Sequence, residues 1–386
     1  MLKKLSSFFV RKPCFVIGFC LIIIAGCKTK YNQTGLSFCY WKTTFDLNTK
    51  EDSLMSDLGV NHLYIRFFDV DWNPFEHEAL PVATVGNFWS LNQNISMTPS
   101  IFITNTVMEK CSKTQLDSLA IRIYKRTSGI IDYYKESFIS NYVDKITDHP
   151  HTKKLNSDSI TKIARNIIDR RINEVLIDCD WTLNTRDNYF YFLKQIKKQF
   201  SPYSLTATLR LWQYKQRKTA GVPEADRCLL MCYSMESPTN YDIENSISSV
   251  STLSKYMTKE TYPLKLDVAL PVFNWAVMFR NGNFNGLINN VNPDDYKDDT
   301  VNYAPVTENR YRLKKDMVLG NKYFRYGDET RIEQVSPTEL EKMIKLLKRH
   351  IQTDDHTRIT FFSWDTTYVK QYGIKNLKNY SDLLHH

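Results

Sequence analysis

Glycine and proline are scarce in this chain of 386 residues, which contains 12 glycines and 13 prolines. With 42% hydrophobic and 24% charged residues, the composition excludes a disordered chain, a collagen-like repeat and a coiled coil. The length suits one large domain or two small ones, and it allows a sizeable core. Aromatic residues are abundant, with 23 tyrosines and 7 tryptophans, which predicts an aromatic core and leaves rings for stacking surfaces.

Several common functional motifs are also missing. The chain has no C-x-x-C pair and no H-E-x-x-H spacing, so we expect no structural zinc site. No glycine-rich phosphate loop is present, and we expect no cofactor. The formal net charge is +9, but the cations are spread along the chain without a basic block, so a nucleic-acid partner is not expected.

Long apolar runs are absent except near the N-terminus. Lys3, Lys4, Arg11 and Lys12 precede the 13-residue apolar run 14–26, which is too short for a membrane-spanning helix but typical of a secretory signal. The run ends in Ile24-Ala-Gly-Cys27, which resembles a bacterial lipobox. The resemblance implies a signal peptide over 1–26, lipidation of Cys27 and a lipid-anchored linker over 27–35; an uncleaved signal anchor is the alternative.

The compartment follows from the residues around the predicted cleavage site. Lys28, Thr29 and Lys30 replace the acidic residues that surface-exported lipoproteins of the Bacteroidetes type carry, so we expect the outer membrane with the protein facing the periplasm. The mature chain would keep Cys39, Cys111, Cys179, Cys228 and Cys232 besides Cys27. Four of these five lie in apolar runs, which favours buried free thiols over a disulfide.

Eight apolar runs predict strands, and most are continuous enough for parallel strands buried on both faces: Leu36–Trp41, His62–Val70, Met97–Asn105, Glu174–Trp181, Ser204–Leu211, Cys228–Met235, Leu264–Trp275 and Ile359–Asp365. Amphipathic helices lie between them. One ends before residue 174, one follows Thr185 as its N-cap, and one begins with the capping-box pattern Ser336-Pro-Thr-Glu339.

This alternation predicts an α/β fold, a (β/α)8 TIM barrel over 36–386. An open doubly wound sheet is the alternative, disfavoured because a glycine-rich loop does not follow the first strand. Residues 106–173, between the third and fourth strands, predict a long helical connection. Residues 276–335, after the seventh strand, are too many for a simple loop and predict an inserted subdomain.

Polar side chains cluster at the predicted carboxyl ends of the strands, where barrel enzymes place their sites. Asp178 and Asp180 share one face of a strand, so at least one should have a raised pKa or a cationic partner. Arg66 or Arg210 could neutralise them in a structural network, and the two D-x-D patterns could instead hold a divalent cation.

The order of these motifs resembles glycoside hydrolase family 18, the chitinase and endo-N-acetylglucosaminidase group. Ile177–Trp181 is similar to the fourth-strand signature D-G-x-D-x-D-W-E, and Met231-Cys-Tyr233 is similar to M-x-Y-D. Phe38–Trp41 resembles the first strand, and Trp364 falls where a tryptophan closes the sugar site. The resemblance implies that Asp180 orients an N-acetyl group and that Tyr233 bonds the reaction intermediate.

The chain departs from that family at the catalytic acid, where Thr182 replaces Glu, and at Val175 and Ser234, which replace Asp. Without the Glu nothing at that position protonates the leaving oxygen. Glu236, Asp71 and Asp365, all at predicted strand ends, are the candidates to replace it; the alternative for each is a surface or network carboxylate. The W-K-T-T-F and R-F-F-D-V-D-W runs resemble those of a group of Bacteroidetes lipoproteins without an assigned activity.

The sequence therefore predicts a lipid-anchored envelope protein that binds or hydrolyses a glycan at the carboxyl-terminal mouth of a glycoside-hydrolase-like barrel. The alternative is a non-catalytic glycan-binding or structural envelope lipoprotein. If it is an enzyme, we expect non-standard acid and base groups among Asp178, Asp180, Tyr233, Glu236 and Asp71. The residues predicted to contact sugar are Trp41, Arg66, Asp69, Trp72, Arg210, Gln213, Trp275, Trp364 and Asp365.

Overall fold

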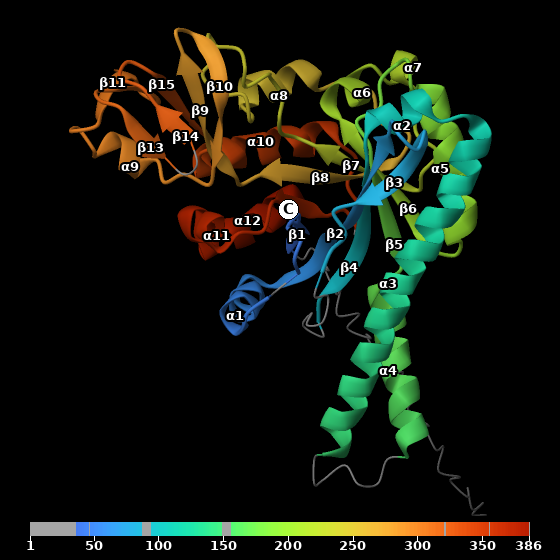
Figure 1. The fold of residues 1–386 in the computed structure, drawn as a ribbon. Helices are drawn as coiled ribbons and strands as arrows, with labels where there is room; N and C mark the ends of the chain where they lie inside the picture. Colours follow the sequence, from blue (N-terminus) through green and yellow to red (C-terminus); the bar gives the residue numbers. More distant parts are fainter. Residues whose placement is uncertain are drawn as a thin grey trace, which may run out of the picture. The chain divides into compact units, whose positions relative to one another are not determined.

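A computed structural model describes residues 36–45, 47–86, 94–148, 156–319, 322–354 and 356–385. Nine strands form one sheet, and all but the antiparallel edge strand β3 (Glu78–Val82) are parallel. The parallel strands close into a barrel because the last pairs with the first (Figure 1). In order they are β1 (Leu36–Tyr40), β2 (Val60–Asn73), β4 (Ser96–Ile103), β5 (Glu174–Asp178), β6 (Ser204–Arg210), β7 (Arg227–Met231), β8 (Lys265–Pro271) and β16 (Ile359–Phe362). The predicted (β/α)8 barrel is confirmed.

Helices connect the strands and cover the outside of the barrel. The described helices are α1 (Thr49–Leu58), α2 (Asn105–Lys110), α3 (Lys113–Thr147), α4 (Ser157–Arg171), α5 (Arg186–Phe200), α6 (Leu211–Lys215), α7 (Arg217–Ala220), α8 (Val250–Tyr256), α10 (Pro337–His350), α11 (Thr366–Tyr372) and α12 (Ile374–His385). The predicted helical connection between the third and fourth barrel strands contains α2, α3 and α4, and α3 alone has 35 residues.

Two predicted N-caps differ in their hydrogen bonds. Thr185 precedes α5 but makes no capping bond; its hydroxyl oxygen accepts from the Thr182 N–H at 2.9 Å, and the hydroxyl donates to Asn105. Ser336 caps α10 as predicted and accepts from the Glu339 backbone N–H. The capping box is not closed, because the Glu339 carboxylate accepts from the backbone of Val250 at 2.7 Å and so ties α10 to α8.

The insertion after the seventh barrel strand builds a separate antiparallel sheet of five strands. Its members are β9 (Asn274–Arg280), β10 (Asn283–Asn289), β11 (Tyr303–Thr307), β12 (Arg310–Leu313) and β15 (Glu329–Gln334), accompanied by α9 (Asp294–Lys297) and the hairpin of β13 (Met317–Leu319) and β14 (Lys322–Phe324). The sheet has its own apolar core, which includes Met278, Tyr303 and Phe324.

The predicted strand 264–275 is two strands, and this prediction was wrong. The chain leaves the barrel after Pro271, and β9 then begins at Asn274 in the inserted sheet. Proline has no N–H to donate to a continuing ladder, which favours a strand end at that point. The run Cys228–Met235 also ends early, at Met231, because Ser234 takes a left-handed backbone conformation with φ of 51°.

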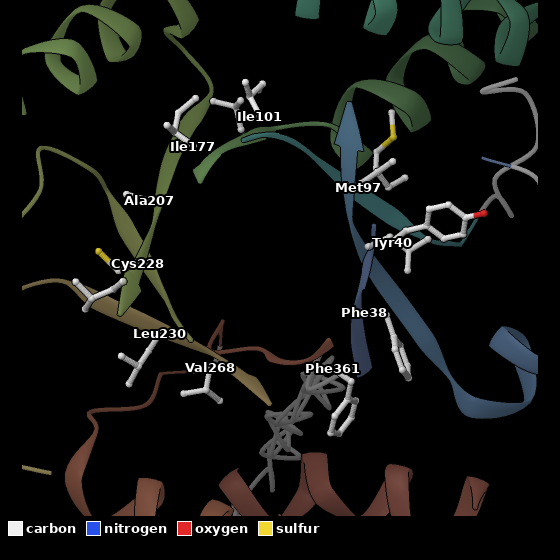
Figure 2. Packing of buried hydrophobic residues seen from close by; sticks show 14 of the residues in the cluster. Phe38, Tyr40, Met97, Ile101, Ile177, Ala207, Cys228, Leu230, Val268 and Phe361 are labelled. Carbon is white, nitrogen blue, oxygen red and sulfur yellow. The ribbon is translucent and has the colours of Figure 1, made fainter. Parts of the chain in front are cut away.

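The outer layer of the barrel is apolar and packs beneath the helices. Alternate residues on each strand face outward, so Phe38 and Tyr40 of β1 join the main core while Ser37 and Cys39 face the barrel interior. Figure 2 shows several of these outward side chains around the ring of strands, directed away from its centre. The five cysteines of the described part are buried free thiols, as predicted.

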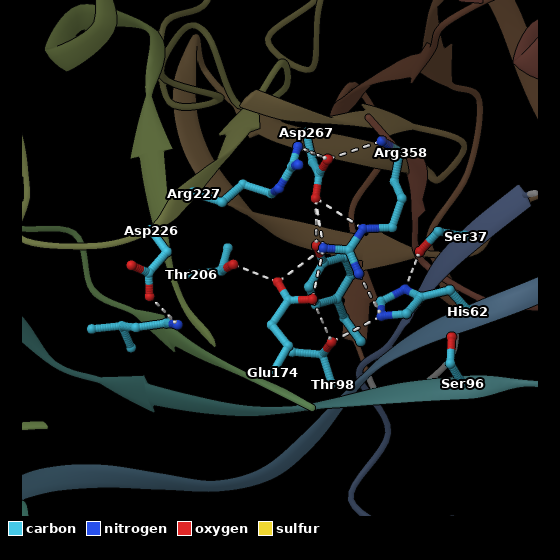
Figure 3. A network of polar contacts seen from close by, with 12 residues as sticks. Ser37, His62, Ser96, Thr98, Glu174, Thr206, Asp226, Arg227, Asp267 and Arg358 are labelled. Carbon is cyan, nitrogen blue, oxygen red and sulfur yellow. Dashed lines mark hydrogen bonds and ion pairs between the residues drawn. The ribbon is translucent and has the colours of Figure 1, made fainter. Parts of the chain in front are cut away.

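The floor of the barrel interior is polar and charged, which the sequence reading missed (Figure 3). We define this floor cluster as the inward side chains at the strand starts: Ser37, His62, Thr98, Glu174, Thr206, Arg227, Asp267 and Arg358. Arg358 lies at its centre. Its guanidinium donates to Asp267 at 2.7 and 2.9 Å, to Glu174 at 2.9 Å and to His62 Nε2 at 2.9 Å.

The floor cluster fixes the protonation of its histidine. Burial, and then the positive charge of Arg358, hold the pKa of His62 well below its ordinary value. The imidazole is therefore neutral, with Nε2 accepting from Arg358 and Nδ1–H donating to the Ser37 hydroxyl at 2.8 Å. Asp267 is fully buried and is satisfied by Arg358, by Arg227 at 3.0 Å and by the Tyr64 hydroxyl at 3.1 Å.

We predict that Arg358→Leu destabilises the protein by about 3–5 kcal/mol, because it leaves two buried carboxylates without their shared cation. The free energy of unfolding from urea titration measures this loss. Arg312→Leu is the matched control, because Arg312 pairs with Glu329 while 55% of its side chain is exposed. That variant should lose no more than about 1 kcal/mol. Equal losses in the two variants would contradict a central role for Arg358.

Candidate functional site at the barrel mouth

The inward positions at the carboxyl ends of the strands form a polar and aromatic cluster. We define the mouth cluster as Trp41, Arg66, Asp69, Asp178, Asp180, Arg210, Tyr233, Phe273 and Phe362. The period of two along a strand places most of these side chains above the floor cluster on the same inward face; Glu174 and Asp178, for example, belong to one strand. Asp69 follows Arg66 by three residues, and an irregularity in the pairing of β2 with β4 lies between them. The mouth is where barrels of this kind place their functional groups.

Charged side chains of the mouth cluster are arranged as two ion pairs. Arg210, at the end of β6, donates from Nε and Nη2 to the two oxygens of Asp180, each at 2.5 Å. Arg66 makes a similar fork to Asp69, with Nε at 2.6 Å from Oδ1. These side chains remain partly exposed, at 28% for Arg210 and 44% for Asp180, so the pairs line the mouth and are not locked in the core.

Asp178 is the carboxyl of the mouth cluster whose pKa is shifted from its ordinary value. Its Oδ1 accepts from the Thr208 hydroxyl at 2.8 Å. Burial first, and then repulsion by Asp180, raise the pKa of Asp178 to about 6, although Thr208 and Arg210 oppose the rise. The predicted conflict between Asp178 and Asp180 is therefore relieved in two ways: Asp180 has a cationic partner, and Asp178 takes up a proton near neutral pH.

Aromatic rings form the other half of the cluster. The ring of Tyr233 stacks on Phe362, with centroids 4.9 Å apart, and Trp41 contacts Phe362 at 5.8 Å. The ring of Phe273 contacts both Tyr233 and Trp275, with centroid distances of 6.0 Å and 5.2 Å, respectively. Burial raises the pKa of the Tyr233 phenol well above its ordinary value, so this hydroxyl remains protonated and can donate a hydrogen bond.

Phe273 and Phe362 were missing from the predicted site. Both lie in continuous apolar runs, in which the sequence does not reveal which residues face inward. The register of β16 with β1 and β8 shows the alternation: Phe361 packs in the outer core, and Phe362 points into the barrel. Side chains two residues apart on a strand face the same side, so the buried polar residue Thr360 indicates that Phe362 also faces inward.

Three residues predicted to contact sugar lie elsewhere. Gln213 is fully buried, with its amide donating to the Trp181 carbonyl and its oxygen accepting from the Arg210 backbone. Trp364 is 1% exposed and packs edge-on against Phe38 in the outer core. Asp365 caps α11 by accepting from the Thr367 N–H at 2.8 Å. Each serves the fold, and we remove all three from the candidate site.

Two of the carboxyls predicted to replace the missing Glu accept hydrogen bonds from residues outside the mouth cluster. Glu236 accepts from the Thr252 hydroxyl at 3.3 Å, and Asp71 accepts from the Thr104 hydroxyl at 2.7 Å. Thr182 occupies the position of the family's Glu, and its backbone N–H donates to Thr185 in the turn before α5. Asp178, by contrast, lies within the mouth cluster.

Trp275 links the candidate site to the inserted sheet. Its indole N–H donates to Glu333 at 2.8 Å, and Glu333 also pairs with Arg331 at 2.6 Å. Both side chains of that pair are fully buried. Arg331 donates in turn to carbonyls of Pro238, Asn240 and Tyr241, so the insertion holds the loop that follows Tyr233.

Trp72, another residue predicted to contact sugar, is half-buried against the main core.

Within the described ranges, no group of three or more His, Cys, Asp or Glu side chains is arranged to hold a metal ion. The four aspartates of the two D-x-D patterns have other partners: arginines bind Asp69 and Asp180, and threonine hydroxyls donate to Asp71 and Asp178.

Comparison with known proteins gives little beyond the fold. Neither a protein-family model nor a curated protein sequence matches this chain. Among solved structures, the chain is similar to the C-terminal domain of ChiA from Legionella pneumophila, with 10% identity, 90% of this chain and 97% of that chain covered, and a TM-score of 0.35. The assignment as a barrel therefore rests on the strand pairing itself.

We predict that Asp178→Asn stabilises the folded protein at pH 7.5 by up to about 3 kcal/mol. The pKa of about 6 lies above the ordinary 3.8, so the native state binds the extra proton and loses stability as pH rises through 4–6. Asparagine mimics the protonated form and removes that loss. Unfolding free energies at pH 4 and pH 7.5 measure the effect, and the gain should vanish at pH 4. A gain of the same size at both pH values would contradict the raised pKa.

Proposed function

We propose that the mouth cluster binds a glycan. The observation that carries the proposal is the placement of two arginine–carboxylate forks beside the stacked rings of Tyr233 and Phe362. Sugars present hydroxyl groups that need both donors and acceptors, and their C–H faces pack on aromatic rings. The mouth cluster offers both kinds of surface at the end of a barrel where binding groups usually lie.

The forks also suit a neutral ligand better than a strongly charged one. Each arginine is matched by one carboxylate, so neither pair presents an uncompensated charge to the ligand. The guanidiniums retain N–H groups beyond those used in the forks, and the carboxylates retain lone pairs. Asp180 therefore stays in the site as an orienting carboxylate, with Arg210 as its positioning partner.

Glycan hydrolysis is a second candidate function, favoured by the pKa of about 6 at Asp178. A carboxyl with that pKa can donate a proton to a leaving oxygen near neutral pH and take one back from water. Thr182 cannot do so, which favours binding without turnover. The two candidates share the ligand and differ only in the role of Asp178.

Arg210→Gln should weaken glycan affinity about ten- to a hundredfold, because it removes a charged donor and releases Asp180 from its fixed position. A glycan array identifies a ligand for the full-length protein in detergent, and calorimetric titration then compares the variants. Arg165→Gln is the matched control, since Arg165 is an exposed arginine of α4. Circular dichroism checks that each variant is folded. Unchanged affinity in folded Arg210→Gln would refute the mouth as the binding site.

A hydrolysis screen on the same ligands separates the two candidates. Product release that falls about 10²–10⁴-fold in Asp178→Asn, with binding retained, identifies Asp178 as the acid. Binding without product release by the unmodified protein identifies a non-catalytic binder.

We further propose that the protein is anchored in the outer membrane, facing the periplasm, through lipid on Cys27. The support is the apolar run 14–26 and the lipobox-like Ile24–Cys27, which lie outside the described residues. In the described part, no helix has the length and apolar character to cross a bilayer.

The Cys27→Ala variant should fractionate away from membranes, because the thioether that holds the lipid cannot form. Membrane flotation of expressing cells measures this, and Cys20→Ala, inside the apolar run, is the control that should remain bound. Membrane retention of Cys27→Ala would exclude the lipid anchor and leave the uncleaved signal anchor.

A further inference from the structure

A pocket of about 310 Å³ lies apart from the mouth cluster, between the α6–α7 segment and the loop that precedes β8. Its wall is unusually rich in positive charge. Four cations and one carboxylate line it: Lys215, Arg217, Lys218, Lys259 and Glu260. The glycan site proposed above does not use any of these residues.

The single carboxylate is already engaged. Glu260 pairs with Arg217 and lies 3.5 Å from Lys218. Among the residues that the structure describes, Lys215 and Lys259 have no carboxylate partner, so the pocket carries an excess of three positive charges. Like charges that converge on one hollow repel, and an anion in the pocket would remove that cost.

The guanidinium of Arg217 gives the pocket a fixed part. Only 10% of its side chain is exposed, and its contact with Glu260 holds it against the wall. Arginine binds phosphate through a planar fork, whereas lysine contributes mobile point charges. One mostly buried arginine, three lysines and Thr219 line the same pocket, and together they are a donor set that matches a phosphate group.

We propose that this pocket binds a phosphate monoester. Such a group carries about −1.5 to −2 charges near pH 7, which fits the excess of three cations better than a single carboxylate does. The phosphate can come from a phosphorylated sugar or from glycerol 3-phosphate, and both present the same three terminal oxygens. This binding does not depend on the function proposed for the mouth.

The pocket and the mouth are joined by a short helix. Arg210 precedes α6 and Lys215 ends it, so the backbones of these two residues are about 7.5 Å apart along the helix axis. A phosphorylated glycan that occupied the mouth could therefore extend to the pocket. This last step, unlike phosphate binding itself, rests on the proposed glycan function.

Calorimetric titration of the full-length protein in neutral detergent tests the proposal, with glucose 6-phosphate and glycerol 3-phosphate as probes and glucose and glycerol as their uncharged controls. At least one phosphate ester should bind, its uncharged control should not, and affinity should fall as NaCl rises from 50 to 300 mM. The ester that binds with the higher affinity identifies the source of the phosphate group. No binding of either ester at millimolar concentration would overturn the proposal.

Charge variants locate the binding. Lys215→Gln with Lys259→Gln should weaken the ester at least about tenfold, because two uncompensated cations are lost. The control double variant Lys162→Gln with Lys348→Gln removes two exposed lysines elsewhere and should bind as the unmodified protein does. Equal affinity in both double variants would overturn the assignment to this pocket. The Lys215 and Lys259 double variant should keep its affinity for an uncharged glycan at the mouth, so failure at the mouth and failure at the pocket are distinguishable.

Discussion

The hydrogen bonds of the Arg358 guanidinium are the interaction on which the rest of the structure depends. They join side chains from β2, β5 and β8 at the centre of the barrel floor, where only 17% of the Arg358 side chain is exposed. Because side chains alternate along a strand, a shift of one residue in any of these strands would put an apolar group against the charge and a charge into the outer core. The floor cluster therefore sets the register of the barrel as well as its closure.

That register positions the mouth. Glu174 and Asp178 lie four residues apart on β5, so fixing the first at the floor places the second about 13 Å higher on the same face. His62 and Arg66 have the same relation on β2. The mouth cluster contains a carboxyl, Asp178, whose ionisation is disfavoured by its surroundings. This free-energy cost is usually absent from a fold but is often found at functional sites. The floor cluster supplies the rigidity that allows the fold to tolerate it.

The sequence was sufficient for the barrel and insufficient for much of its interior. Continuous apolar runs are strong signals for buried parallel strands, which is why the eight barrel strands could be found. The same continuity hides which residues face inward, and so Phe362 escaped notice while the nearby Trp364 was assigned to the site. Glu174 and Asp267 were not recognised as members of a charged cluster because their partner Arg358 is 91 residues from the nearer of them. Gln213 looked like a ligand contact because its burial depends on the turn after β6, which no local pattern reveals.

The inserted sheet begins and ends at one place. Its first strand, β9, pairs directly with its last, β15, and Asn274 lies opposite Gln334. Two backbones paired in this way are only about 5 Å apart, so a few residues would suffice to join the barrel across the gap. In evolution the segment could therefore be gained, lost or exchanged as one unit without changing the order of the barrel strands. Arg331 and Glu333 connect the segment to the loop after Tyr233, so a different insertion would change the shape of one wall of the mouth.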